Sequence, residues 1–196
     1  ADRPPSLEPI VCRTVELDEH APAAPTLAPG PMSGPAAMNF PKVCPEHEIA
    51  DRRLPKVDAV DVELSSTSIA ATVVSAAHAL GKPVILSFHD FTQTPALDQL
   101  NRTARDARGA GADIVKVASM CTNQEDVRTL TRFTLDHAEA GVVVIGMGPI
   151  GVPTRILFPA LGSLFTFAAY GEGTAPGQLP LDALAQIVAQ LYPRER

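Results

Sequence analysis

The sequence predicts an α/β protein whose parallel sheet is covered by helices on both faces. From residue 57 onward, short apolar runs alternate with longer amphipathic runs. In the middle of the chain, successive strands are spaced by about 28 residues, as βαβ units require. The chain has 196 residues, of which 45% are hydrophobic and 19% charged. This composition suits one globular domain with a sizeable core.

We predict six strands at most, each a short run rich in β-branched or other apolar residues. In chain order they are Pro9–Arg13, Val57–Leu64, Pro83–Phe88, Ala112–Ala118, Val142–Met147 and Ser163–Ala169. Amphipathic periodicity predicts helices over Ser68–Leu80, Thr94–Gly109, Asn123–Ala140 and Leu181–Leu191. Gly81 is expected to end the first helix, because glycine readily adopts the left-handed conformation just past a helix end.

Proline divides the chain, since 11 of its 19 prolines lie in residues 1–55. We expect residues 1–20 to hold the first strand, residues 21–56 to form a Pro-rich loop or linker, and residues 57–196 to form the β/α portion. Proline removes backbone donors and its small neighbours bury little surface, so an extended or disordered segment is expected there. A lid, or a wrap over a neighbouring surface, is the alternative.

Charge and cysteine content argue against several partners. The formal net charge is −6, which repels polyphosphate backbones, so no nucleic acid partner is expected. Cys12, Cys44 and Cys121 lack CxxC spacing and suggest neither a metal site nor a disulfide framework. No apolar run reaches the ~18 residues of a membrane span, and the first residues do not resemble a signal peptide. A cytoplasmic protein without a membrane partner is predicted.

Lys116 lies inside the apolar run Ile114–Ala118. A lysine in a strand covered on both faces loses hydration, so it either becomes neutral or finds an acid. A neutral amine is nucleophilic and could form a Schiff base with a carbonyl substrate. Alternatively, Lys116 lies near the strand's end and reaches solvent or a carboxylate.

His89 follows the strand Pro83–Phe88, where parallel α/β folds place their ligands. A histidine there could shuttle protons, and Lys116 near the end of the next strand would share the same rim. A capping or hydrogen-bonded structural role is the alternative when His89 is taken alone.

The segment Gly146–Gly151 reads GMGPIG and matches the spacing of the dinucleotide-binding fingerprint GxGxxG. A nucleotide-binding domain is therefore a rival prediction. Two features oppose it: Pro149 removes a backbone donor from the turn, and no acidic residue ends the following predicted strand.

Several segments together resemble the type I 3-dehydroquinate dehydratase family over roughly residues 57–192. Their order, spacing and local context agree with that family's motifs. They are SFHDFTQTP at residues 87–95, GADIVKVASM at 111–120, GMGPIGVPTR at 146–155, LGSLFTFA at 161–168 and TAPGQL at 174–179.

The resemblance implies catalytic roles for Lys116 and His89. In that family the strand lysine forms an imine with the substrate ketone, and the histidine of the SxHDFxxTP motif relays protons. The imine acidifies the neighbouring carbon, so a proton leaves and the adjacent hydroxyl departs as water. The resemblance implies no metal and no dissociable cofactor.

The resemblance also implies substrate-binding residues. Arg155, in the MGxxGxx(S/T)R motif, is expected to hold the substrate carboxylate. Thr174 and Gln178, in the (S/T)APGQ motif, are expected to close over the substrate. Arg13, in a segment similar to the family's third strand, and Glu63, in one similar to its fourth, complete the predicted set.

The family fold is an eight-stranded β/α barrel, so the resemblance implies a truncated (β/α) TIM-type barrel of about six parallel strands with outer helices. Nothing in the chain resembles the family's first two strands. After Arg13 the family has an acid and a glycine pair, whereas this chain has Glu16 one residue early and no glycines. Where this family usually has lysine in the MGxxG loop, this chain has Pro149.

The predicted function is therefore that of a hydro-lyase. It would dehydrate 3-dehydroquinate, or a close polyhydroxylated keto acid, to the conjugated enone. The alternative is a noncatalytic relative that binds a shikimate-pathway metabolite or a partner protein. A homodimer is expected, because a sheet with open edges invites association.

Overall fold

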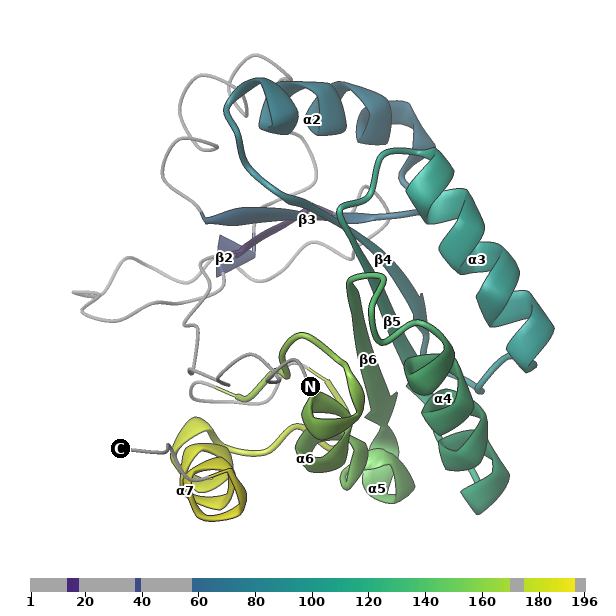
Figure 1. The fold of residues 1–196 in the computed structure, drawn as a ribbon, viewed down its shortest axis with the longest axis vertical. Coiled ribbons are helices and arrows are strands. Elements are labelled where there is room, and N and C mark those ends of the chain that lie inside the picture. Colours follow the sequence, from purple (N-terminus) through teal and green to yellow (C-terminus); the bar gives the residue numbers. More distant parts are fainter. Residues whose placement is uncertain (1–13, 18–37, 40–57, 170–174, 193–196) are drawn as a thin grey trace, which may run out of the picture. The chain divides into compact units, whose positions relative to one another are not determined.

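The computed structural model describes residues 14–17, 38–39, 58–169 and 175–192. The chain divides into two compact units. One unit comprises residues 11–89 and 101–116, and we call it the Lys116 unit. The other comprises residues 1–10, 90–100 and 117–196, and we call it the Arg155 unit. Figure 1 labels the helices and strands of the chain.

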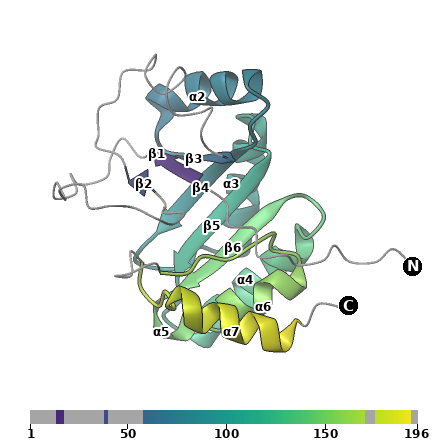
Figure 2. The same cartoon turned by 90° about the vertical axis from the view of Figure 1, so that its left-hand side faces the viewer.

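The sheet has the strand order β2-β1-β3-β4-β5-β6. Its strands are β1 (Thr14–Leu17), β2 (Met38–Asn39), β3 (Ala59–Glu63), β4 (Val84–Asp90), β5 (Ile114–Met120) and β6 (Val142–Met147). Strand β1 pairs in parallel with β2 and with β3, and β3 pairs in parallel with β4. Figure 2 shows β1 beside β3. The α/β class with a parallel sheet is confirmed.

The helices are α2 (Thr67–Ala79), α3 (Leu97–Gly109), α4 (Gln124–Asp136), α5 (Gly148–Gly151), α6 (Thr154–Leu157), the 3-10 turn η3 (Phe158–Leu161) and α7 (Leu181–Leu191). The four predicted helices correspond to α2, α3, α4 and α7, whereas the short helices α5 and α6 and the turn η3 were not predicted. Gly81 has φ +64° and ends α2, and the Lys82 N–H donates to the Ala77 carbonyl at 2.9 Å. The predicted helix end is therefore confirmed.

Each unit buries its own apolar residues. In the Lys116 unit α2 packs on β3, and the core holds Val60, Val62, Val73, Ala77, Ile85, Leu86 and Val115. In the Arg155 unit α4 packs on β6, and the core holds Leu130, Phe133, Val142, Val143, Val144, Met147 and Phe158. All six residues of β6 are buried, as expected for a parallel strand covered on both faces.

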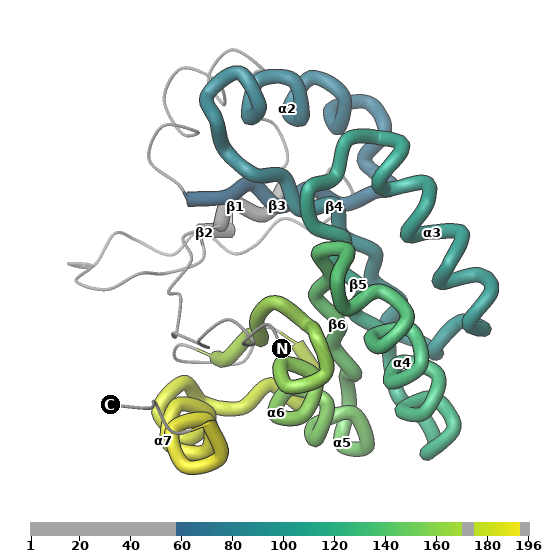
Figure 3. Tube along the Cα trace, viewed as in Figure 1, coloured from purple at the N-terminus to yellow at the C-terminus, as the bar shows by residue number. Residues whose placement is uncertain are grey.

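One predicted strand is wrong. Residues 163–169 make two isolated bridges, Ser163 with Val142 and Ala169 with Pro180, and form no strand between them. Side chains take the carbonyls that a ladder would use: Arg155 Nη1 donates to the Phe167 carbonyl, and Gln178 Nε2 donates to the Ala168 carbonyl. The chain from β6 through the short helices α5 and α6 to α7 is traced in Figure 3.

The predicted strand Pro9–Arg13 lies outside the described residues, and β1 begins directly after it. Most of the Pro-rich segment also lies outside them, although Met38 and Asn39 form β2 within it. Within the described ranges, no helix combines the length and the apolar character that crossing a membrane requires.

Candidate active site

Lys116 points from β5 toward a buried carboxylate. Its Nζ lies 2.7 Å from Asp61 Oδ2, and the two side chains are only 5% and 1% exposed. Pairing with an acid was expected under both interpretations of Lys116, so this contact excludes only a lysine that reaches solvent. The Lys116 amine therefore lies in a nearly dry environment beside a carboxylate.

Asp61 has a second buried partner. The Ser87 hydroxyl donates to Asp61 Oδ1, and Ser87 is completely buried. Both carboxylate oxygens thus accept hydrogen bonds, one from Lys116 and one from Ser87. Neither Asp61 nor Ser87 was among the predicted site residues.

His89 is held by Glu63 from the neighbouring strand. Glu63 Oε2 lies 2.5 Å from His89 Nδ1, and Glu63 Oε1 accepts the His89 backbone N–H at 3.3 Å. The two side chains are 17% and 15% exposed, so the pair is partly open to solvent. The resemblance predicted that Glu63 binds substrate, whereas the contacts seen here bind it to His89.

Strand alternation brings these groups to one face. Asp61 and Glu63 are two residues apart on β3, and Ser87 and His89 are two residues apart on β4. The parallel register places Glu63 opposite Ser87. The signal that could have found Asp61 is the sequence Asp-Val-Glu itself, since two acids separated by one residue share a face of a buried strand.

Arg155 is buried in the Arg155 unit, on α6. The residue is 1% exposed, and burial lowers the pKa of its guanidinium below the ordinary value. Nη1 donates to the Phe167 carbonyl at 3.2 Å and Nη2 to the Pro176 carbonyl at 3.4 Å. Its Nε is buried without a hydrogen-bond partner among the described residues. Within the described part of the chain, one donor of this cation is therefore left without an acceptor.

The segment 175–178 is tied to the same unit by hydrogen bonds. The Pro176 carbonyl accepts the Gly148 N–H at 3.1 Å as well as the Arg155 guanidinium. Gln178 donates from Nε2 to the Ala168 carbonyl at 3.2 Å and accepts the Ala175 N–H at 3.4 Å. Two other predicted binding residues, Thr174 and Arg13, lie outside the described residues.

Close packing accounts for the glycines of the GMGPIG segment. A Cβ on Gly151 would lie 2.9 Å from Gly146 Cα, and closer still to the Gly146 carbonyl group. The Gly148 N–H is already bonded to Pro176, and α5 has only four residues. A dinucleotide fingerprint needs free N–H groups at the start of a longer helix, so the geometry does not favour the rival nucleotide-binding prediction.

Comparison with known proteins gives a consistent result. The family model described as type I 3-dehydroquinase matches residues 46–195. The chain is 44% identical over 139 residues to the 3-dehydroquinate dehydratase of Methanosarcina barkeri, covering 68% of this chain and 57% of that protein. It is 34% identical over 137 residues to the 3-dehydroquinate dehydratase of Klebsiella pneumoniae, covering 67% of this chain and 55% of that protein.

Solved structures agree with the sequence relatives. The crystal structure of 3-dehydroquinate dehydratase from Geobacillus kaustophilus matches with a TM-score of 0.68 at 31% identity, over 79% of this chain and 64% of that one. The enzyme from Aquifex aeolicus matches with a TM-score of 0.68 at 28% identity, over 76% of this chain and 67% of that one. The chain spans about 57% of the length of the first curated relative. It belongs to the type I 3-dehydroquinase family, and its fold is a portion of that family's TIM-type barrel.

Proposed function

We propose that this chain dehydrates 3-dehydroquinate, or a close polyhydroxylated keto acid, through a Schiff base on Lys116. The observation that carries the proposal is a buried lysine amine paired with Asp61 in the same unit as a histidine–carboxylate pair. Family membership and relatives named 3-dehydroquinate dehydratase support it. The chain spans just over half of the length of such a relative, so we propose, and do not infer from that relative's name, that this chain is itself active.

The chemistry follows from the residue types. Neutral Lys116 Nζ attacks the substrate ketone, and loss of water from the resulting carbinolamine leaves a cationic imine. The imine withdraws electrons from the adjacent carbon, so a base can remove a proton there. The electron pair then forms the new C=C bond as the neighbouring hydroxyl, protonated by a general acid, leaves as water. Hydrolysis of the imine returns Lys116 and releases the enone.

His89 is the proposed base that removes the carbon-bound proton and the proposed acid that protonates the leaving hydroxyl during elimination. Its Nδ1 faces Glu63, so Nε2 is the ring nitrogen proposed to exchange a proton with substrate. A carboxylate on Nδ1 fixes the ring orientation and stabilises the imidazolium that forms when Nε2 takes a proton. Glu63 is thus proposed to act through His89, in addition to the substrate-binding role implied by the resemblance.

Arg155 is proposed to bind the substrate carboxylate and Gln178 its hydroxyls. The buried Nε of Arg155 is a charged donor without a partner among the described residues, which favours an anionic oxygen as its acceptor. Thr174 and Arg13 retain their proposed substrate contacts from the resemblance alone.

Borohydride trapping tests the imine directly. The protein is incubated with 3-dehydroquinate and sodium borohydride, and its intact mass is measured. We expect a reduced covalent adduct on the native chain and none on Lys116→Ala. Lys82→Ala is the matched control, because it removes a lysine from the loop before β4, and it should keep the adduct.

The same experiment separates the two candidate functions. An unmodified mass at millimolar substrate, together with stabilisation of the fold by that substrate, would favour the noncatalytic binding protein. Formation of the adduct together with the enone's absorbance supports the hydro-lyase. The measurement requires no added metal or cofactor under the proposed mechanism.

We also propose a homodimer in the cytoplasm, with a small molecule as the other partner. The two-residue strand β2 is the first strand in the sheet order among the described strands, and a short strand edge of this kind can pair with a second copy. Light scattering at micromolar concentration should give twice the chain's mass of 20.7 kDa. A monomeric mass over that range would refute the dimer.

A further inference from the structure

We propose that Asp61 is the buried counter-ion of Lys116 throughout imine formation and that Ser87 positions its carboxylate for this task. This inference rests on the proposed function, because it assigns the proton that Lys116 must lose before it can attack a carbonyl. It adds two residues, Asp61 and Ser87, to the reacting group.

The contact geometry supports a counter-ion rather than a surface ion pair. Lys116 Nζ and Asp61 Oδ2 are 2.7 Å apart, and neither side chain is more than 5% exposed. The Ser87 hydroxyl fixes the other carboxylate oxygen and is itself completely buried. Surface ion pairs contribute little, but separating a buried pair leaves an uncompensated charge in a dry interior.

Other charged residues lie near Asp61, and Glu16 on β1 is its partner in the parallel register. Glu63 on β3 and His89 on β4 form their own pair at 2.5 Å. Val60 and Val62, which flank Asp61 along β3, are completely buried and carry no charge. Asp61 is therefore the acid that the described geometry places in hydrogen-bonding contact with the Lys116 ammonium.

The proton balance defines the role of the pair. The ammonium transfers a proton to the Asp61 carboxylate, which gives a neutral amine and a carboxylic acid. The amine's electron pair forms the new C–N bond, and an N–H proton moves to the carbonyl oxygen to give the carbinolamine. Asp61 then returns its proton to that hydroxyl, the C–O bond breaks, water leaves, and the cationic imine faces a carboxylate again.

These proton transfers leave the net charge of the buried pair unchanged. The pair begins as ammonium and carboxylate and ends as iminium and carboxylate, so no unpaired charge stands in the interior before or after the step. Without Asp61, both cations lose their counter-ion, and burial then favours the neutral amine.

Competitive acetylation measures the Lys116 amine without any substrate. Protein is treated with trace acetic anhydride between pH 6 and 11, and peptide mass spectrometry gives the acetylated fraction of Lys116, with Lys82 as internal reference. We expect Asp61→Asn to lower the midpoint of Lys116 acetylation by about one to three pH units. Asp61→Glu should restore it, and Ser87→Ala, which keeps the charge, should move it much less.

Asp58→Asn is the matched control, because it makes the same change of carboxylate to amide at an exposed position just before β3. It should leave the midpoint unchanged. Circular dichroism checks that each variant is folded. If Asp61→Asn does not fold, the acetylation midpoints of the native protein still test the inference. A Lys116 midpoint more than about one pH unit below that of Lys82 would mean that no counter-ion stabilises the ammonium, and it would overturn the inference.

Trapping with 3-dehydroquinate and borohydride then separates the inference from the proposed function. In Asp61→Asn the cationic imine on Lys116 loses the same counter-charge as the ammonium. A Lys116 pKa lower by about one unit corresponds to a tenfold weaker preference of that nitrogen for its cationic form. Adduct yield at pH 7 should therefore fall about tenfold or more in Asp61→Asn. An unchanged acetylation midpoint in folded Asp61→Asn overturns the counter-ion role. A shifted midpoint with no adduct on the native chain overturns the proposed imine function while supporting the Lys116–Asp61 pair.

Discussion

Glu63 and His89 form a two-point contact between neighbouring strands. One carboxylate oxygen lies 2.5 Å from the imidazole Nδ1, and the other accepts the backbone N–H of the same histidine at 3.3 Å. The acid therefore fixes both the ring and the strand end that carries it. This contact supports the proposal that Nε2 is the ring nitrogen that exchanges a proton with substrate.

Glu63→Gln should slow elimination while imine formation persists. The amide keeps the size of the side chain but removes the charge that stabilises the His89 imidazolium, so enone formation should fall roughly 100-fold. Absorbance of the enone measures the rate of elimination, and borohydride trapping measures the amount of imine formed on Lys116. Equal losses in both measurements would contradict a role that acts through His89.

Arg155→Met should destabilise the Arg155 unit. The substitution roughly retains the apolar stem but leaves the Phe167 and Pro176 carbonyls without their guanidinium donors, at a cost of about 2 to 4 kcal/mol in the free energy of unfolding. Urea titration measures it. Arg128→Met on the exposed face of α4 is the control and should change stability by less than about 0.5 kcal/mol.

Gly151→Ala should be strongly destabilising. Its new Cβ would come within 2.9 Å of Gly146 Cα, where the backbone cannot move away cheaply, so a loss of about 2 to 3 kcal/mol is expected. Gly109→Ala is the matched control, because no heavy atom lies within 4 Å of its added Cβ. Thermal unfolding should show a lower midpoint temperature for Gly151→Ala than for the native chain, whereas Gly109→Ala should not lower the midpoint.

Asp113 makes the fold sensitive to acid. Burial alone would raise the pKa of its carboxyl, but hydrogen bonds from the Val84 N–H at 2.8 Å and from His78 outweigh burial and lower the pKa below 3.8. Because the folded pKa is the lower one, the carboxylate stabilises the fold above pH 3.8. This stabilisation is lost as the pH falls through the lowered pKa.

Asp113→Asn tests that contribution. Both Asp113 and His78 are nearly half exposed, so solvent screening limits the expected loss at pH 7 to less than about 1 kcal/mol. Urea unfolding should show a smaller difference from the native chain at pH 3 than at pH 7, because the stabilisation from the carboxylate declines as the pH falls toward the lowered pKa. A difference of the same size at both values would assign it to packing instead of charge.

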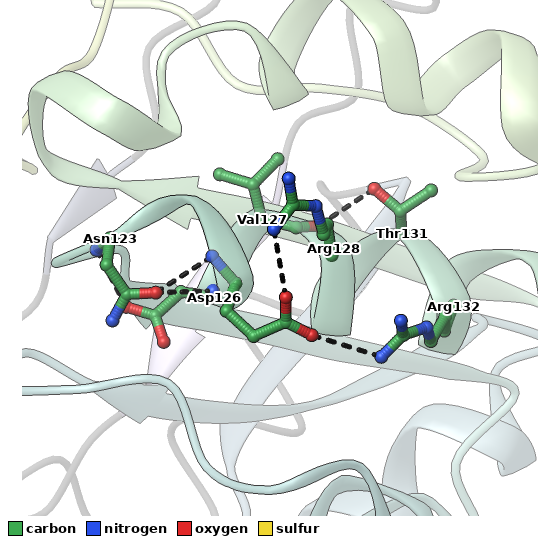
Figure 4. A network of polar contacts seen from close by, with 7 residues as sticks. Asn123, Asp126, Val127, Arg128, Thr131 and Arg132 are labelled. Carbon is green, nitrogen blue, oxygen red and sulfur yellow. Dashed lines mark hydrogen bonds and ion pairs between the residues drawn. The ribbon is translucent and has the colours of Figure 1, made fainter.

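Asn123→Ala should weaken the start of α4. Its side-chain oxygen accepts the N–H groups of Glu125 and Asp126, and Asp126 reaches back to the Asn123 N–H. Figure 4 shows this cap beside the ion pairs between Glu125 and the two arginines of the same helix. Loss of the cap should cost about 1 kcal/mol, measured by urea unfolding, and Asn123→Asp should retain most of it.

Local sequence patterns were sufficient for some of the regular elements. Strand β6 and helix α7 have the predicted bounds, because an unbroken apolar run and an amphipathic repeat each specify one structure. Strand β4 runs past its predicted end to Asp90. The Glu63 side chain accepts the His89 N–H there, a long-range contact that no local pattern shows.

Residues 163–169 illustrate the opposite case. Their apolar run predicts a strand, but Arg155 and Gln178, distant in sequence, bond two of its carbonyls. Backbone groups that are already bonded to side chains cannot extend a ladder, so the strand does not form.

The sequence by itself determined the α/β class, the order of most elements, and the identity of Lys116 and His89 as the reactive candidates. These conclusions depend on spacing and residue type along the chain. Only the tertiary structure decided that Asp61 pairs with Lys116 and Glu63 with His89. The physical reason is that burial forces a charged side chain to take an opposite charge, and which acid is within reach depends on strand register across the sheet.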